Sequence, residues 1–98
     1  MSARDIAARL RAVKDPELGI DVVSLGLVYG IDDEGDCMRV LMTMTSPGCP
    51  MGEVLVGSVE QALEFARPES DIAVDVTFEP AWNPKMMTVE AMLQLGLR

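Results

Sequence analysis

Two alternating segments separated by a helical one constrain this fold more than any other feature of the sequence. Residues 38–45 alternate apolar and polar side chains, which is the period of a half-buried strand, and residues 72–79 repeat that pattern. Between them, residues 51–66 carry apolar side chains at helical spacing with glutamates opposite. A strand, a helical crossover and a second strand predict a sheet with helices packed on it.

One helix and one strand come before this unit, and a further helix comes after it. Residues 3–13 have helical spacing, and residues 27–32 indicate a strand that ends in an acidic turn at 32–36, where Gly35 is expected to have a positive φ. Thr88 is a suitable N-cap for a last helix, which Gly96 would end. We therefore predict a two-layer α+β sandwich in the order helix, strand, strand, helix, strand, helix, with a small three-stranded mixed sheet.

Length and charge narrow the classes of protein. A chain of 98 residues predicts a single domain over residues 1–98. The net charge of −8 opposes binding to nucleic acid or anionic membranes, and no histidine is present to act as a general base or metal ligand. Because no apolar run is long enough for a signal peptide or a membrane span, we expect a cytoplasmic protein.

Cys49 is the strongest candidate for chemistry. If Pro50 occupies the first helical position, Cys49 becomes the N-cap of the helix over 51–66. A thiol accepts hydrogen bonds poorly there, but the unpaired N–H groups of a helix N-terminus favour the thiolate. An isolated cysteine is ordinarily a small buried apolar residue. The Pro-Gly-Cys-Pro frame instead favours a functional thiol at Cys49.

Cys37 has a different interpretation. It opens the second strand, so some 20 Å should separate it from Cys49, too far for a disulfide or a shared metal. We predict that Cys37 is structural. Since one thiolate cannot hold a cluster alone, three alternatives remain for Cys49. Two copies could share a cluster in a dimer, the thiolate could hold a cluster or sulfur transiently, or it could be a redox or nucleophilic thiol without metal.

Five further residues are weaker candidates. Asp15 and Glu17 flank a proline after the first helix and could supply oxygen ligands or cap the next turn. Thr43 and Thr45 lead into the segment that carries Cys49, where they would either hydrogen-bond that segment or lie on the surface. Trp82, in a proline-rich loop, would cover the edge of the core or wall a pocket beside the cysteine.

Three ordered motifs resemble those of a known family. They are residues 13–20 with 25–28, residues 43–50, and residues 82–84 with 86–88 and 95–96. Together they resemble the metal–sulfur cluster assembly factors, the SufT- and PaaD-like proteins with a MIP-eighteen-type domain. The chain lacks the cysteine-rich extension of the PaaD branch and the Walker motif of ATPase-fused relatives, so a free-standing member without a nucleotide is expected.

The resemblance implies a fold similar to iron–sulfur assembly domains and a non-catalytic role in cluster maturation. The family's motif cysteine corresponds to Cys49, and its carboxylates correspond to Asp15 and Glu17. A transient iron–sulfur cluster or iron would be the cargo. Client or scaffold proteins, and a second copy in a homodimer, would be the partners. The alternative is a thiol-dependent redox protein with Cys49 as nucleophile, against which the lack of a resolving thiol within reach counts.

Overall fold

The computed structural model describes residues 3–16, 18–45 and 52–96, and its elements follow the predicted order. These elements are α1 (Ala3–Leu10), β1 (Val28–Asp33), β2 (Cys37–Met42), α2 (Gly52–Ala66), β3 (Asp71–Val76), the 3₁₀ turn η1 (Pro84–Met86) and α3 (Val89–Gln94). The turn η1 lies within the proline-rich loop that carries Trp82. Among the described residues, none of the helices combines the length and hydropathy needed to cross a bilayer.

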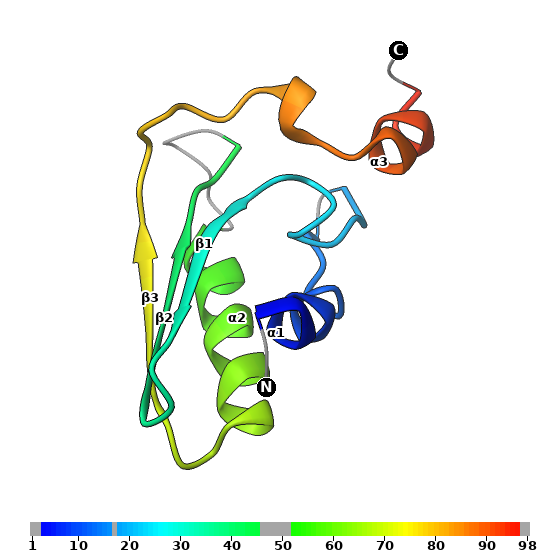
Figure 1. Cartoon of the computed structure of the whole chain (residues 1–98). Coiled ribbons are helices and arrows are strands. Elements are labelled where there is room, and N and C mark those ends of the chain that lie inside the picture. Colours follow the sequence, from blue (N-terminus) through cyan, green and yellow to red (C-terminus); the bar gives the residue numbers. More distant parts are fainter. Residues whose placement is uncertain (1–2, 17, 46–51, 97–98) are drawn as a thin grey trace.

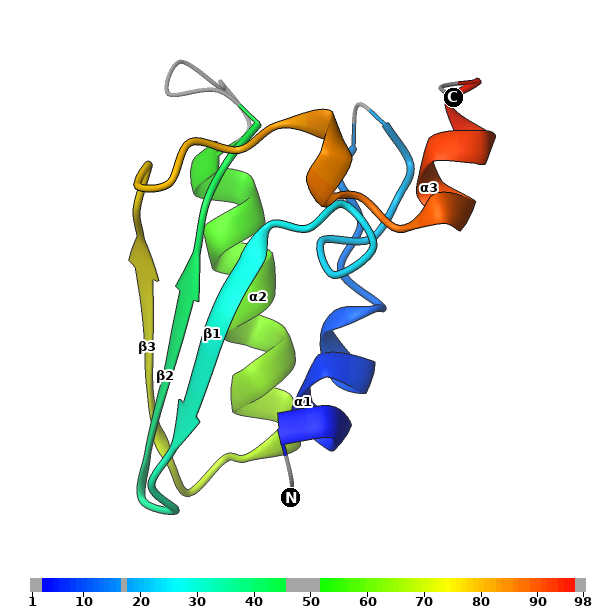
Figure 2. The ribbon, with the colours of Figure 1, turned by 45° about the horizontal axis from the view of Figure 1, so that its top comes forward.

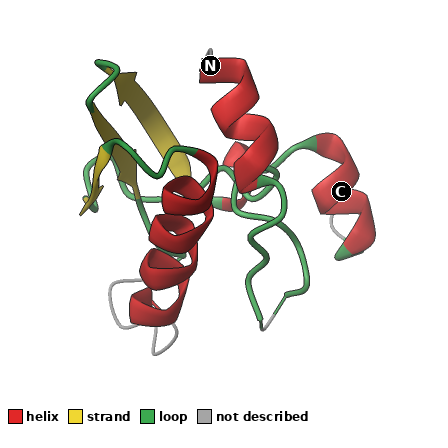
Figure 3. Cartoon of the chain, turned by 90° about the horizontal axis from the view of Figure 1, so that it is seen from below, coloured by secondary structure: helices red, strands yellow, loops and turns green. Residues whose placement is uncertain are grey.

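The sheet has the order β1-β2-β3, with β2 in the centre. β1 and β2 are antiparallel, and β2 and β3 are parallel because α2 crosses between them. Figures 1 and 2 show α1 and α2 on one side of the three strands, and Figure 3 shows the same two layers from below. The predicted two-layer α+β sandwich with a mixed sheet is confirmed.

The core lies between the sheet and the helices. Along β2 the side chains alternate between buried and exposed, as the sequence predicts, and Met38, Val40 and Met42 are completely buried. The buried residues of α2 are Leu55, Val59 and Leu63. Their spacing of four residues places them on one face of the helix, which packs on the sheet. This packing fixes where both ends of β2 lie.

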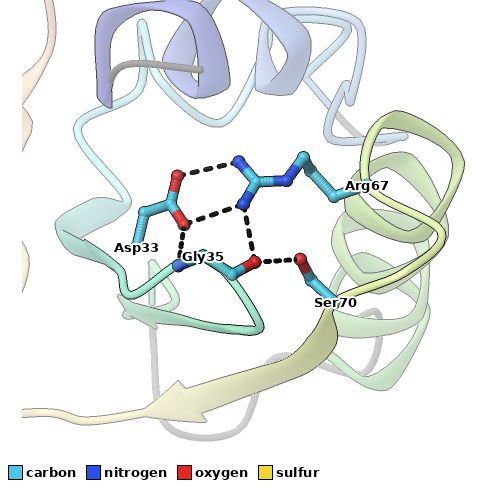
Figure 4. Close-up of polar contacts among 4 residues, drawn as sticks. All are labelled: Asp33, Gly35, Arg67 and Ser70. Atoms are coloured by element: carbon cyan, nitrogen blue, oxygen red, sulfur yellow. Dashed lines mark hydrogen bonds and ion pairs between the residues drawn. The ribbon is translucent and has the colours of Figure 1, made fainter.

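An ion pair and hydrogen bonds join the β1–β2 turn to the connection between α2 and β3. Arg67 donates two hydrogen bonds to the carboxylate of Asp33, at 2.8 and 3.1 Å, and a third to the Gly35 carbonyl at 2.8 Å. The Ser70 hydroxyl donates to the same carbonyl at 2.6 Å (Figure 4). The Arg67 hydrogen bond, followed by one from the Gly35 amide, lowers the pKa of Asp33. Gly35 has the expected positive φ, at +88°.

Several apolar side chains are more exposed than their spacing predicts. Val54 lies on the flank of α2, since the helix packs through residues four apart from Leu55 onward. Phe78 follows the end of β3 and lines an open hollow beside the first turns of α2. In α3, Val89 and Leu93 are each 66% exposed, and the buried residue is Ala91. The last helix therefore packs through Ala91 and the partly buried Met92, and leaves Val89 and Leu93 in solvent.

Candidate functional site

A tight turn organises the end of the sheet at which β2 finishes. We call residues 21–27 the hub turn. Backbone hydrogen bonds at 3.0 Å join Leu25 to Asp21 and Leu27 to Val22, and the Asp21 carboxylate accepts from the Ser24 amide at 2.9 Å. Val22, Leu25 and Leu27 are completely buried. Apolar anchors and local hydrogen bonds thus hold this turn against the core while its backbone faces the neighbouring segments.

Asp15 lies in the segment that enters the hub turn. Its amide donates to the Ile20 carbonyl at 2.9 Å, and its carboxylate oxygen Oδ1 accepts from the Leu18 amide at 3.2 Å. The residue is 4% exposed. These contacts are those of a residue that caps the turn after it, one of the two roles predicted for Asp15. Its role as a metal ligand stays a prediction, and Glu17 lies outside the described residues.

Thr43 connects the end of β2 to the hub turn. Its amide donates to the Leu27 carbonyl at 2.8 Å, and the residue is completely buried. The interpretation of Thr43 as a surface residue is therefore wrong. β2 ends at Met42, so Thr43 leaves the alternation of the strand and turns toward Leu27. Its Oγ1 approaches the Met44 carbonyl at 3.5 Å, a long contact that contributes little.

The described residues on either side of the segment that carries Cys49 are Thr45 and Gly52. Thr45 is partly exposed and is the last described residue before it, and Gly52 is the first after it. The Met44 side chain lies 3.6 Å from the Cβ position that a substituent on Gly52 would occupy, so both ends of the segment lie close together. Cys49 itself is outside the described residues.

Trp82 belongs to a segment that crosses the hub turn, residues 80–88, which we call the strap. The Trp82 indole Nε1 donates to the Leu25 carbonyl at 2.7 Å, and the Thr88 amide donates to the Ser24 carbonyl at 2.8 Å. Trp82 is partly buried against the core. Figures 1 and 2 show the strap, in orange, passing along the end of the sheet from β3 toward α3. The plug interpretation of Trp82 is supported by these contacts, and its role in a pocket stays a prediction.

Two further contacts hold the strap, and neither follows from the sequence motifs. Gly26 has φ +77°, and the position of a Cβ there would clash with the backbone of Met86, so only glycine allows this approach. The Tyr29 hydroxyl donates to the Pro80 carbonyl at 2.8 Å. The glycine that interrupts the apolar run of residues 20–29 was the available signal for the first contact, whereas nothing near Tyr29 in the sequence indicates the second.

The structure thus brings together Asp15, Thr43 and Trp82 around the hub turn, and Thr45 follows Thr43. Cys37 is a free, partly exposed cysteine at the opposite end of β2. Within the described ranges, no group of three or more histidine, cysteine, aspartate or glutamate residues could hold a metal ion. The described residues therefore form a hydrogen-bonded frame around the hub turn, but they contribute no complete metal site.

Comparison with known proteins identifies the family. The model of the family described as "Iron-sulfur cluster assembly protein" matches residues 3–78. The chain belongs to the iron–sulfur cluster assembly protein family. This family member is 42% identical to an Fe-S protein maturation auxiliary factor from Porphyromonas gingivalis, in an alignment that covers 94% of this chain and 89% of that protein. It is 46% identical to the Fe-S protein maturation auxiliary factor SufT of Staphylococcus aureus, over 87% of this chain and 98% of that protein.

A solved structure supports the fold of this family member. It is the domain of unknown function DUF59 from Bacillus anthracis, with a TM-score of 0.89 and 43% identity, over 97% of this chain and 92% of that one. The resemblance to the assembly factors and the predicted α+β fold are therefore both confirmed.

Proposed function

We propose that this protein is a non-catalytic auxiliary factor in the maturation of iron–sulfur proteins in the cytoplasm, and that it acts through Cys49. The observation that carries the proposal is the match of residues 3–78 to the assembly family. The names of the two relatives, both maturation auxiliary factors, agree with it. In this proposal iron, sulfur or a cluster is cargo that passes through the protein, and client or scaffold proteins are its partners.

The geometry around the hub turn supports a role for the segment between Thr45 and Gly52. Its leading end is held by the hydrogen bond from Thr43 to Leu27, which is itself buried in the core. Its trailing end enters α2, whose buried face fixes that helix on the sheet. The described residues on both sides of the segment are therefore fixed by the core, and a site held by fixed neighbours suits the binding of a cargo.

The ligand count favours transient holding of the cargo. The described residues offer no three-ligand metal group, and stable clusters take about four protein ligands. A cluster bound by Cys49 would therefore take its other ligands from a client protein or from a second copy in a homodimer. Asp15 and Glu17 are proposed as auxiliary oxygen ligands in the same process. The redox alternative gains no support, because the other thiol, Cys37, opens β2 at its far end.

Anaerobic reconstitution with ferrous iron and sulfide tests the role of Cys49. The wild type, Cys49→Ser and the matched control Cys37→Ser are reconstituted, followed by visible absorption and by iron and sulfide counts. We expect a chromophore in the wild type and in Cys37→Ser, and its loss in Cys49→Ser. Far-UV circular dichroism of all three proteins shows whether the variants are folded.

Transfer to a client gives an independent readout. Each reconstituted protein is mixed with the apo form of a [4Fe–4S] enzyme, and the recovery of that enzyme's activity is followed. Recovery with the wild type and Cys37→Ser, but not with Cys49→Ser, supports the proposal. A folded Cys49→Ser variant that keeps the chromophore and restores the enzyme as fast as the wild type would overturn the assignment to Cys49.

A further inference from the structure

A groove between α1 and α2 differs in charge from the rest of the protein. It has a volume of about 450 Å³ and opens to solvent. Arg9 and Lys14 line one side. Ser58, Gln61, Ala62 and Phe65 of α2 line the other. None of the described residues that line the groove is acidic, although the chain has twice as many acidic as basic residues. The groove is therefore a cationic and apolar surface on an acidic protein.

The sequence distributes its charges in the same way. Residues 1–14 contain four of the eight basic residues and one of the sixteen acidic ones. Arg9 and Lys14 are exposed, and neither takes part in the two ion pairs found among the described residues. On α2, the glutamates keep to another face, where Glu53 and Glu60 line a separate hollow beside β3. The two cations are thus available to a carboxylate from another molecule.

Phe65 supplies the apolar part of the surface. It is 86% exposed, the most exposed of the large apolar side chains in the described ranges. It shares one helix face with Ser58, Gln61 and Ala62, which precede it by seven, four and three residues. Burial of an exposed phenylalanine side chain is favourable because it removes apolar surface from water, so a partner that covers Phe65 gains binding free energy. An aromatic at the edge of a groove is a typical anchor for a protein partner.

We propose that this groove binds an amphipathic helical segment of a partner protein, with apolar side chains over Phe65 and aspartate or glutamate residues at Arg9 and Lys14. A groove between two helices accommodates a third helix, which presents side chains three and four residues apart. Two cations match a few carboxylates, whereas an extended polyanion such as nucleic acid or an anionic membrane would also meet the acidic remainder of the protein. None of the described residues that line this groove belongs to the hub turn, although Lys14 pairs with Asp21 through its backbone, and the inference holds whatever Cys49 does.

Selection from a random peptide library tests the partner chemistry. Sixteen-residue peptides displayed on phage are selected on immobilised full-length wild type, and peptides that also bind Phe65→Ala are removed. We expect the recovered sequences to repeat apolar residues at helical spacing and to contain an excess of aspartate and glutamate. The proposal would be overturned if the recovered sequences had no excess of acidic residues. It would also be overturned if every recovered peptide bound the wild type and Phe65→Ala equally well.

Binding of a recovered peptide, measured by fluorescence anisotropy, tests the location. We expect Kd to rise at least about tenfold in Phe65→Ala and in Lys14→Glu, as for an interface anchor and a charge reversal. The matched controls are Phe78→Ala and Lys85→Glu, which change an exposed aromatic and an exposed cation outside the groove and should leave Kd unchanged. Equal effects of control and groove variants would refute the site. The proposal would also be refuted if the peptide displaced a second copy of the chain or an anionic vesicle from the protein, because the groove would then bind that copy or membrane.

Discussion

Replacement of Gly26 by alanine tests whether the hub turn and the strap are one structural unit. Gly26 has φ +77°, and an added Cβ would lie 2.8 Å from the Met86 carbonyl carbon and 2.9 Å from the Met86 Cβ. Carbon atoms in contact normally lie at least 3.5 Å apart. Since the obstacle is largely backbone, a rotamer change cannot relieve it. The strap must move away from the hub turn.

The cost can be estimated from the contacts that this movement breaks. Alanine in the left-handed region costs about 1–2 kcal/mol relative to glycine. Loss of the hydrogen bonds from Trp82 to Leu25 and from Thr88 to Ser24 adds about 1 kcal/mol each. We therefore expect Gly26→Ala to lower the free energy of unfolding by about 3–4 kcal/mol, which a domain with a stability of roughly 5–15 kcal/mol can tolerate while remaining folded.

Gly19→Ala is the matched control. Gly19 has a similar φ of +70°, but nothing lies within 4 Å of the Cβ position, so this variant bears the backbone cost alone, about 1–2 kcal/mol. Urea unfolding followed by circular dichroism measures both variants. The protein's single tryptophan, Trp82, reports on the strap, and its emission should shift to longer wavelength only in Gly26→Ala. Equal destabilisation by the two substitutions, with unchanged emission, would refute the reasoning.

Two other contacts give predictions of their own. Thr88→Ala removes the cap in which the Thr88 hydroxyl oxygen accepts a hydrogen bond from the Ala91 amide at 3.2 Å. The substitution should destabilise α3 by about 1 kcal/mol, which faster hydrogen exchange at Ala91 would show. Unchanged exchange at Ala91 would contradict the cap. Asp33→Asn should lower the urea midpoint most at neutral pH. Arg67 holds the pKa of Asp33 below its ordinary value, so the stabilisation from this ion pair is present above about pH 4 and disappears as pH falls through the lowered pKa. A difference between variant and wild type that does not change with pH would show that the ion pair is not its cause.

The layers of the fold could be predicted because they follow from local patterns. The alternation around Met38 and Val40 identifies a strand with one buried face, and the Pro-Gly breaks separate it from its neighbours. The turn at Gly35 and the cap at Thr88 have short-range causes and were also predictable. The buried face of α3 was not, because Val89 and Leu93 suggest burial by size, whereas Ala91 and Met92 are the residues of α3 that contact the core.

The sequence could predict individual residues of the candidate site, but not the contacts that join them. The motifs singled out Asp15, Thr43 and Trp82, but nothing in the sequence indicates that the backbone around Leu25 connects them. Hydrogen-bond partners 57 residues apart, such as Trp82 and Leu25, leave no periodic signal. The burial of Thr43 has a different cause: the alternating pattern continues to Thr45 in the sequence, whereas β2 ends at Met42.

The strap also sets an order of events during synthesis. The sheet, α2 and the hub turn are complete once residues 3–76 have been made, whereas the partners of Leu25 and Ser24 are Trp82 and Thr88. A nascent chain can therefore pair its strands and pack α2 on them before the strap, which adds the buried Met87 to the core, has left the ribosome. The backbone carbonyls of Ser24 and Leu25 lack these partners during that interval. In a newly made protein the strap would therefore bind last, to a hub turn that has already formed.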